Sequence, residues 1–320
     1  MWKKDYLKLM YPTNQEEMKM EEAMELKYLN IPDSLFKYRA FSQYSLENFI
    51  NDEVRVTSAN NFNDPFDCAH TLDFNKFVDQ RMRQGLLNEI PTIIRTHKLE
   101  YSIDEVINNL RDKPFMEILK FGLSLGPAVN QDPGALDQFA ITIEKTIEDV
   151  HYKKLIEIID RVQRSTYVCC FSEVNDSTLM WSHYAENHSG FCLEYDFKQC
   201  GRKDILTRAL QPVIYSNELF DMTPYFNTPG RYNNLVSTFS AISKSKEWEY
   251  EREWRLAFPI GEDFKPFNRH VPKPKGVYLG AKIKPDIKEK LMKIAKKKDI
   301  NVFQMRLGNT NFQLTKKQII

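Results

Sequence analysis

Residues 166–197 read TYVCCFSEVNDSTLMWSHYAENHSGFCLEYDF, and their pattern is the clearest indication of the fold class. Its first six residues form an apolar run with β-branched and aromatic members, which favours a strand. The segment from Ser177 to Glu186 has apolar residues at helical spacing, and Gly190 to Phe197 mostly alternates apolar and polar residues, as a strand does. The stretch therefore predicts a strand, a helix and a second strand, as in a mixed α+β domain.

Similar patterns continue on both sides of this stretch. Toward the N-terminus, Leu35 to Arg39 and Val54 to Thr57 are expected strands, with a helix from Ser45 to Asn51 between them. Toward the C-terminus, the expected strands are Val213–Tyr215, Trp254–Phe258, Val277–Leu279 and Val302–Met305, and the expected helices are Tyr232–Lys246 and Asp286–Lys298. These segments predict one α+β domain over residues 31–320.

Two further segments read as helical additions to that domain. Residues 1–30 carry apolar side chains at loose helical spacing among many charges, which predicts a peripheral helical extension packed on the domain. From about residue 74 to 164 the pattern is helical, with weak breaks at Pro91, at Pro114 and between Gly126 and Gly134. We expect this second segment to be an inserted helical subdomain.

Composition limits the compartment and the partners. The chain has 45 Lys and Arg against 44 Asp and Glu, so its net charge of +1 gives no general attraction to nucleic acid or to an anionic membrane. No stretch approaches the roughly 18 to 20 apolar residues that a membrane helix needs. The five cysteines, two of them adjacent, match neither a disulfide framework nor a zinc site. We expect a cytoplasmic protein with reduced thiols and no membrane partner.

The first candidate site segment lies where the two N-terminal strands end. Arg39 closes the first strand, and its planar fork of donors suits a phosphate or a carboxylate, although a surface salt bridge is the simpler interpretation. The second strand leads into a turn rich in Asn, Asp and Pro, which includes Asn63 and Asp64. Such a turn can bond only its own backbone, or it can form a ligand loop at a strand end. Both interpretations of the turn remain open.

The second candidate segment follows the strand that ends near Ser172. On the expected helix, Trp181 and Tyr184 are three residues apart and share a face, and His183 lies on a neighbouring face. Two amphipathic aromatic rings can stack on a ligand ring and still donate a hydrogen bond, but aromatics at helical spacing are often core residues. His183 and His188 are five residues apart, which is poor spacing for two metal ligands on one helix face. No metal site is expected.

The third candidate segment is the run EWEYEREWRLAF from Glu247 to Phe258. If the whole run were extended, Glu247, Glu249, Glu251 and Glu253 would line one side, with aromatics and arginines opposite. The run then describes either a solvated edge strand or a group of carboxylates whose mutual repulsion and desolvation raise a pKa, as in a general base. Both interpretations remain open.

A lysine-rich segment, Lys282 to Lys298, has the pattern of an amphipathic helix docked on a sheet. A solvated face is the preferred interpretation of its lysines. One basic helix without interleaved aromatics lacks the stacking platform expected for binding single-stranded nucleic acid. Nucleic acid is therefore a possible partner that the charge pattern does not indicate.

The order of these motifs resembles the bacterial domain-of-unknown-function family numbered 2971. The matching motifs are Leu35–Arg39, Phe62–Phe66, Cys170–Ser172, Met180–Ala185, His188–Gly190 and Glu251–Arg255. The resemblance covers about Leu35 to Phe258, with the helical stretch before Arg164 as an insertion. It implies no activity.

The layout is also similar, more remotely, to the ADP-ribosyltransferase fold, which implies a mixed, largely antiparallel sheet and NAD as the substrate. In that resemblance Arg39 would hold the pyrophosphate or ribose, and Ser172 with Trp181 and Tyr184 would hold the nicotinamide. Glu251 or Glu253 would stabilise the ribose and its oxocarbenium-like transition state.

Three classes of function follow. The first is an ADP-ribosyltransferase or NAD glycohydrolase, as in a toxin or a phage-defence effector, acting on a macromolecular acceptor that the sequence does not identify. The second is a hydrolase or nuclease that uses Asp64, His183 and Glu253, with or without a divalent ion. The third is a nucleotide-binding regulatory module without catalysis. The candidate catalytic residues are Glu253, Glu251 and Arg39, and the candidate substrate-binding residues are Tyr38, Asn63, Asp64, Ser172, Trp181, His183, Tyr184 and Arg255.

Overall fold

The computed structural model describes residues 2–58, 61–126, 133–226, 231, 233–262 and 264–320. The chain divides into two compact units. Unit 1 comprises Met1–Ala69, Arg161–Phe220 and Asn233–Ile320, and unit 2 comprises His70–Asp160 and Asp221–Tyr232.

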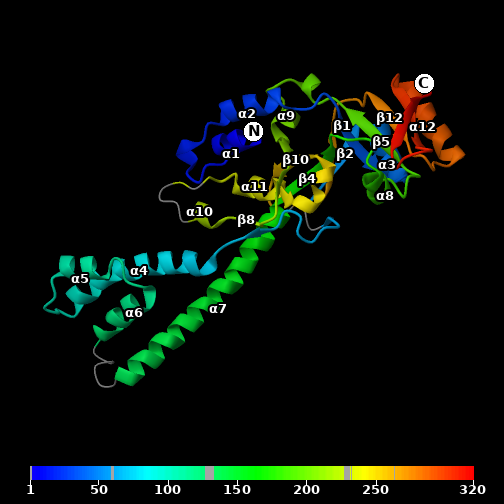
Figure 1. Ribbon diagram of the computed structural model, residues 1–320. Helices are drawn as coiled ribbons and strands as arrows, with labels where there is room; N and C mark the ends of the chain where they lie inside the picture. Colours follow the sequence, from blue (N-terminus) through cyan, green and yellow to red (C-terminus); the bar gives the residue numbers. More distant parts are fainter. Residues whose placement is uncertain (1, 59–60, 127–132, 227–230, 232, 263) are drawn as a thin grey trace. The chain divides into compact units, whose positions relative to one another are not determined.

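Unit 1 is built on a ten-stranded sheet (Figure 1). Its main path runs in the order β11 (Phe267–His270), β2 (Glu53–Ser58), β4 (Thr166–Ser172), β1 (Leu35–Arg39), β5 (Phe191–Tyr195), β12 (Gly276–Leu279), β13 (Asn301–Leu307) and β14 (Leu314–Gln318). Off this path, β10 (Glu253–Pro259) pairs with β4 and with β6 (Leu210–Pro212). In this sheet β12 and β13 are parallel, and the other described pairs are antiparallel. The expected α+β class with a mixed, largely antiparallel sheet is confirmed.

The sheet branches at β4. One edge of β4 pairs with β10 along its whole length. On the other edge, β2 pairs with β4 at Tyr167 and Val168, whereas β1 pairs with it at Ser172. Between these two pairings the Cys170 carbonyl accepts a hydrogen bond from Lys37 Nζ at 2.7 Å. The Lys37 side chain thus takes the place of a backbone hydrogen bond to β4 at the point where β1 and β2 separate.

Unit 1 contains several hydrophobic clusters, and two of them include residues of β1. One contains Trp254 and Leu256 of β10 together with Leu291 of α12 (Pro285–Lys298). The other joins Tyr38 to Trp181 of α8 (Thr178–Tyr184). Because alternate residues of a strand face opposite sides, β1 and β10 each contribute a different set of side chains to each side of the sheet.

The N-terminal segment forms two helices, α1 (Trp2–Met10) and α2 (Met20–Leu29), within unit 1. Tyr6 is fully buried, and the Trp2 ring stacks on the Trp254 ring with a centroid distance of 6.0 Å. These helices therefore contribute to the packing of β10. The remaining elements of unit 1 are η1 (Gln15–Glu17), α3 (Gln43–Ile50), η3 (Lys198–Cys200), α9 (Ile205–Ala209), β7 (Ile214–Ser216), α11 (Val236–Ile242), β9 (Ser243–Ser245) and η4 (Lys246–Glu251).

Unit 2 consists mainly of helices. These are α4 (Phe74–Thr96), α5 (Ile103–Leu110), α6 (Phe115–Ser124), the part of α7 (Pro133–Ser165) up to residue 160, and α10 (Thr223–Phe226); β3 (His70–Thr71) pairs with β8 (Phe220–Asp221). Ile90 and Ile118 are fully buried in its core. Asp73 caps α4 by accepting a hydrogen bond from the Lys76 backbone N–H.

Some expected boundaries differ from the structure. Pro91 lies inside α4, so the break expected there is wrong, whereas Pro114 is the N-cap of α6. Most of the break expected between Gly126 and Gly134 lies outside the described residues, as does Tyr232. The helix expected over Tyr232–Lys246 is shorter in the structure, where α11 spans Val236–Ile242. It is followed by β9, a strand that pairs in parallel with β7.

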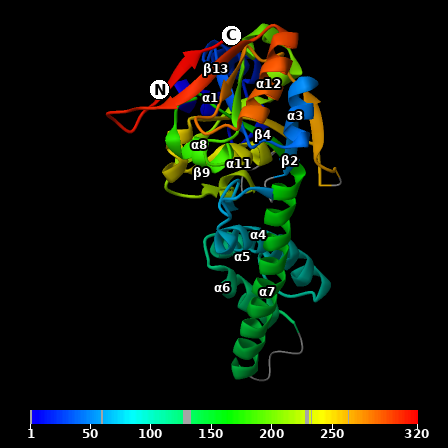
Figure 2. The same cartoon turned by 90° about the vertical axis from the view of Figure 1, so that its right-hand side faces the viewer.

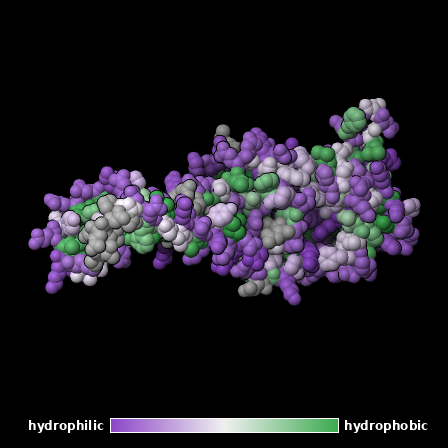
Figure 3. Space-filling model, turned by 90° about the horizontal axis from the view of Figure 1, so that it is seen from below, coloured by the Kyte–Doolittle hydropathy of each residue, from purple (hydrophilic) through white to green (hydrophobic). Residues whose placement is uncertain are grey.

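The face of the molecule drawn in Figure 3 is mostly hydrophilic, and apolar residues appear on it in small scattered groups. Among the helices of the described residues, none combines the length and the apolar composition of a membrane span. All five cysteines are free thiols.

Candidate functional site

Unit 1 contains a pocket of about 170 Å³ next to the branch point of the sheet. Its walls come from β1, β4 and α8, from the loop after β2, and from β9, η4 and the start of β10. The lining residues are Phe36, Lys37, Tyr38, Phe62, Asn63, Asp67, Cys170, Phe171, Ser172, Met180, Tyr184, Lys244, Glu251 and Glu253.

A fully buried arginine lies beside this pocket. Arg255 Nη1 and Nη2 donate to the two carboxylate oxygens of Asp67 at 2.7 and 2.8 Å, so this ion pair is bidentate. Arg255 Nε and Nη2 also donate to Glu253 Oε1 and Oε2 at 2.8 and 3.0 Å. A buried cation is tolerated when its donors are satisfied, and here two carboxylates satisfy them. Arg255, a candidate ligand contact, therefore holds Asp67 and Glu253.

A second buried cation, Lys244, joins the two glutamates. Its Nζ donates to Glu251 Oε2 at 2.7 Å and to Glu253 Oε2 at 2.9 Å, and lies 3.7 Å from Asp67 Oδ2. Burial opposes the charge of Lys244, but the nearby carboxylates outweigh burial and raise its pKa above the usual value. Lys244 is therefore protonated at neutral pH, and the Trp248 ring, 4.9 Å from its Nζ, covers it.

Glu251 and Glu253 differ in their surroundings. Burial raises the pKa of Glu251, although Lys244 and the hydroxyl of Tyr184, which donates to Glu251 Oε1 at 2.8 Å, counteract this effect in part. Burial also acts on Glu253, but Arg255 and Lys244 outweigh it and hold the pKa of Glu253 below its usual value. Two carboxylates in one pocket with pKa values shifted in opposite directions are typical of acid–base and charge-stabilising sites.

Local structure explains how the two glutamates meet. The run is not extended from Glu247, because η4 is a 3₁₀ helix that leaves Glu247 and Glu249 exposed. Arg252 ends η4 in the left-handed region, with φ of 43°. This turn brings Glu251, at the last position of η4, next to Glu253, at the first position of β10. Hence only the last two glutamates of the run join Asp67, Lys244 and Arg255 in a buried charged cluster.

Ser172 holds the same turn from β4. Its Oγ donates to the Glu251 carbonyl at 2.6 Å and accepts from the Val174 N–H at 3.0 Å. On the other side, Tyr215 OH accepts from the Glu253 N–H at 2.7 Å. Ser172 lines the pocket, but its hydroxyl is committed to fixing the backbone of Glu251.

Tyr38 and Trp181 lie mainly in the core. Their rings meet edge to face with centroids 5.3 Å apart, Tyr38 OH donates to the Val174 carbonyl at 2.9 Å, and Trp181 Nε1 donates to the Asn175 carbonyl at 2.7 Å. Tyr38 contributes to the wall of the pocket, whereas Trp181 is fully buried and is not among the lining residues. Of the expected aromatic pair, therefore, Tyr184 rather than Trp181 reaches the pocket.

Arg39 and His183 also lie apart from the buried cluster. Arg39 is half-buried and pairs with Phe191 through the backbone, but it does not line the pocket; Lys37, two residues before it, does. His183 is exposed, with its ring near those of Tyr184 and Trp248.

The turn after β2 supplies both expected and unexpected residues. Ala59 and Asn60, within this turn, lie outside the described residues. Asn63 is exposed and lines the pocket, whereas Asp64 Oδ1 accepts from the Phe66 N–H at 2.9 Å in a local turn. Within the described residues, no hydrogen bond or ion pair joins Asp64 to His183 or Glu253, and of these three residues Glu253 lines the pocket. Asp67, which sequence reasoning missed, is the residue of this turn that joins the charged cluster.

Asp67 and Lys244 were missed because nothing local marks them. Asp67 meets Arg255 across 188 positions of sequence, and Lys244 lies between two serines on a short strand. Charged residues that alternate with large apolar ones ordinarily indicate a strand with one solvated face, whereas both the charged and the apolar residues at the start of β10 are buried. Buried charges require partners of opposite sign.

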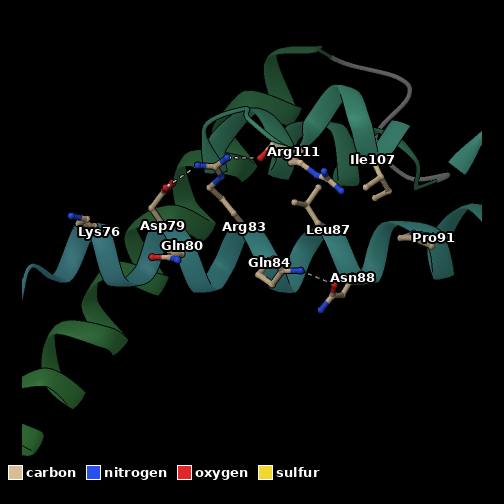
Figure 4. Close-up of a pocket in the computed structure, with 10 residues that line it drawn as sticks. All are labelled: Lys76, Asp79, Gln80, Arg83, Gln84, Leu87, Asn88, Pro91, Ile107 and Arg111. Carbon is tan, nitrogen blue, oxygen red and sulfur yellow. Dashed lines mark hydrogen bonds and ion pairs between the residues drawn. The ribbon is translucent and has the colours of Figure 1, made fainter. Parts of the chain in front are cut away.

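A larger cavity lies in unit 2 (Figure 4). It has a volume of about 860 Å³, and Lys76, Gln80 and Arg111 are among its exposed lining residues. Arg83 donates to the Arg111 carbonyl at 2.7 Å and lies 3.4 Å from Asp79. Each charged side chain that lines it is exposed or half-exposed, so the cavity offers no desolvated acid or base. We therefore place the candidate site in the smaller pocket of unit 1.

No group of three or more His, Cys, Asp or Glu side chains within the described residues has the arrangement of a metal site. In the acidic cluster of unit 1, the Lys244 ammonium contacts the carboxylates of Asp67, Glu251 and Glu253.

Comparison with known proteins gives one match. Residues 180–256 match the model of a family described as "Protein of unknown function (DUF2971)", which confirms the expected resemblance to that family over this segment. Searches of curated proteins and of solved structures find no match. The matched segment contains Tyr184, Lys244, Glu251, Glu253 and Arg255, whereas Lys37 and Asp67 precede it. The matched segment thus contains most of the charged cluster.

Proposed function

We propose that the pocket of unit 1 cleaves the bond between ribose and nicotinamide in NAD, as an NAD glycohydrolase or an ADP-ribosyltransferase. One observation carries the proposal: Glu251 is a buried carboxylate with a raised pKa on the wall of a pocket with aromatic sides. Lys244 and Tyr184 fix its two oxygens, so the carboxylate is oriented before any substrate binds.

The chemistry requires a fixed negative charge. When the bond between C1′ and the nicotinamide nitrogen breaks, its electron pair goes to the ring nitrogen, and positive charge develops on the ribose. A preorganised carboxylate stabilises that charge. In hydrolysis, the oxygen of water bonds to C1′ and one proton is released, giving nicotinamide and ADP-ribose. In transfer, a nucleophile of the acceptor replaces water. We assign the stabilising role to Glu251.

The pocket suits the nicotinamide end of NAD. Phe36, Phe62 and Phe171 line it, and aromatic faces attract a cationic ring such as the pyridinium of NAD. Its volume of about 170 Å³ is below the roughly 300 to 1,000 Å³ of common ligand pockets, so the adenylate end would lie outside it. Lys37 is the cation on the β1 wall, and it replaces Arg39 as our candidate for holding the pyrophosphate.

The other charged residues of the cluster have positioning roles in this proposal. Glu253 and Asp67 neutralise Arg255, and Arg255 with Lys244 keeps Glu253 ionised. Glu253 holds Lys244 from one side, while Lys244 holds Glu251. If the protein depletes cellular NAD, it could act as a toxin or a defence effector. The growth of cells after induced expression of the protein would test this role.

The test is the release of nicotinamide from NAD, followed by chromatography, with and without cell lysate as a source of acceptor. We expect release by the wild type and a loss of at least about 100-fold in Glu251→Gln, the loss expected when one charge-stabilising group is removed. Glu247→Gln is the matched control, since this glutamate is exposed on the same short helix. The control should keep wild-type activity.

The outcomes separate the functional classes. No release by folded wild type would refute the proposal, and tight NAD binding without turnover would instead support a nucleotide-binding module. Loss in Glu253→Gln but not in Glu251→Gln, with both variants folded, would move the catalytic role to Glu253. Label from NAD that stays attached to lysate macromolecules would favour transfer over hydrolysis.

A further inference from the structure

The last fifty residues of the chain are strongly basic. Between Val271 and Ile320 there are thirteen Lys and Arg and three Asp and Glu, a net charge of +10, while the whole chain has a net charge of +1. The preceding residues therefore have a net charge of −9, and the overall balance conceals a basic segment. Such a local concentration, unlike the net charge, is what attracts a polyanion.

Most of these charges lie on one amphipathic helix and beside it. In α12, Leu291 and Ala295 are fully buried, whereas Lys293 and Lys296 are exposed. A groove of about 480 Å³ runs along the exposed face of this helix to the end of the chain. Its lining residues are Pro285, Lys288, Glu289, Met292, Lys293, Lys296 and Ile320.

The neighbouring hairpin of β13 and β14 extends the basic surface. Lys288 Nζ of α12 donates to Gln304 Oε1 at 2.9 Å, so Gln304 faces the helix. Lys317 of β14 pairs directly with Gln304 of β13, and Arg306 lies two residues after Gln304 on β13. Directly paired and alternate residues share a face, so Lys317 and Arg306 lie on the side of the sheet that α12 covers.

Several of these cations are available to a ligand. Lys275, Lys293 and Lys298 already form ion pairs with Glu194, Glu289 and Asp52. For the remaining exposed cations of this surface, the described part of the chain provides no carboxylate within ion-pair distance. They include Lys282, Lys284, Lys296, Lys297, Arg306 and Lys317.

The turn of the same hairpin presents an aromatic ring. Phe312 is fully exposed, and Leu307 is more than half exposed. Gly308 N donates to the Gln313 carbonyl at 2.8 Å and Asn311 Nδ2 donates to Gln313 Oε1 at 3.0 Å, so the turn is closed by its own hydrogen bonds. Figure 2 shows this turn, in red between β13 and the C-terminus, projecting from the rest of unit 1.

We propose that α12 and the β13–β14 hairpin bind single-stranded nucleic acid. The lysines along the groove contact successive phosphates, and Phe312 stacks on an unpaired base. A positively charged groove combined with an aromatic side chain is the arrangement that single-strand binding requires. The lysine helix alone lacks the aromatic, and the hairpin supplies it. This binding is independent of the chemistry proposed for the pocket.

The surroundings of Phe312 favour a base over a membrane. Asn309, Thr310, Asn311 and Gln313 are all exposed in the same turn. Inserting the turn into lipid would dehydrate these amide and hydroxyl groups, which is unfavourable unless they find new partners. Base edges offer such partners, because they carry hydrogen-bond donors and acceptors. Stacking on a base also requires that the base be unpaired, which favours a single strand over a duplex.

Fluorescence anisotropy of labelled 20-nucleotide oligo(dT) and oligo(U), measured with the full chain, tests the proposal. We expect binding that weakens with salt, and a loss of about tenfold or more in Phe312→Ala, the effect of removing one stacking ring. Phe312→Tyr should restore binding. Lys296→Gln should reduce the slope of log affinity against log salt by about 0.7. Phe139→Ala, at an exposed phenylalanine of unit 2, is the matched control and should bind as the wild type.

The comparison ligands decide the outcome. A preference for the RNA or for the DNA strand would support the proposal and identify the source. A duplex of equal length bound as tightly as the single strand, with Phe312→Ala unaffected, would overturn it. Binding to vesicles with phosphatidylserine but to neither oligonucleotide would overturn it in favour of a membrane surface. Since Phe312 is fully exposed, its variants should fold normally.

Discussion

Glu251 and Glu253 share one ammonium group, because Lys244 Nζ lies 2.7 Å from Glu251 Oε2 and 2.9 Å from Glu253 Oε2. Glu253 is also held by Arg255, whereas the other oxygen of Glu251 accepts from a tyrosine hydroxyl. Both carboxylates line the pocket, but Glu253 is held by two cations and Glu251 by one cation and one neutral donor. On this asymmetry our proposal gives Glu253 a positioning role and Glu251 the chemical role.

Arg255→Met should be strongly destabilising. It removes a fully buried cation and leaves the carboxylates of Asp67 and Glu253 with one buried cation, Lys244, between them. Breaking a buried ion pair in this way costs about 3–5 kcal/mol. Urea unfolding should show this loss. Arg161→Met is the matched control, because the Arg161 side chain is mostly exposed and its ion pair with Glu262 is worth about 1 kcal/mol or less. A loss below about 1 kcal/mol in Arg255→Met would contradict the structural role of the cluster.

The pH dependence of stability should have two parts of opposite sign. The folded pKa of Glu251 lies above its ordinary value of 4.5, so the folded state takes up this proton first, and stability rises as the pH falls toward 4.5. The folded pKa of Glu253 lies below 4.5, so its contribution is present above pH 4.5 and is lost as the pH falls further.

Unfolding free energies of the wild type and the two Gln variants, measured between pH 3 and 7, test this pattern. Glu253→Gln should remove the steep loss of stability that occurs as the pH falls below 4.5. Glu251→Gln should remove the gain in stability that occurs as the pH falls from 7 toward 4.5. Identical pH profiles for the two variants would show that the two carboxylates do not titrate in opposite directions.

Tyr184→Phe should shift the pH dependence of nicotinamide release. The Tyr184 hydroxyl donates to Glu251 and lowers its pKa, so removing it raises that pKa further. If ionised Glu251 is required, activity is lost as the pH falls through its pKa, and the variant should lose activity at a higher pH than the wild type. Tyr152→Phe, an exposed tyrosine of unit 2, should leave the profile unchanged. An unshifted acid limb in Tyr184→Phe would argue against Glu251 as the titrating group.

The sequence was most informative where a regular pattern determined a structure. Leu35–Arg39 is a strand as expected, because its apolar residues face two different clusters. Leu314–Gln318 escaped prediction, because this edge strand buries only Leu314 and its other residues are polar. Strand signals come from burial, and an edge strand exposed to water lacks them.

The site was less predictable than the fold for a different reason. Glu251 and Glu253 stand out in the sequence, but the choice between them depends on Lys244 and Arg255, whose directions are set by tertiary contacts. Trp181 and Tyr184 share a helix face by spacing, yet one ring is fully buried and the other reaches the pocket. Periodicity gives the face of a helix and not the depth at which each residue lies on it.

Gly190→Ala should prevent proper packing of β5 against β1. A Cβ at Gly190 would lie 2.2 Å from the Arg39 carbonyl oxygen and 3.0 Å from the Ala185 carbonyl oxygen, and neither backbone atom can move without disturbing its element. We expect a loss of about 2 kcal/mol or more, in the upper part of the range for single substitutions. Gly85→Ala is the matched control: it lies in α4 with no atom within 4 Å of the added Cβ, so it should be neutral or stabilise by about 0.5–1 kcal/mol. Thermal unfolding of both variants decides the matter. Equal melting temperatures would mean that the chain can relax around Gly190, and that this glycine in the family segment is not required by the close approach of β1.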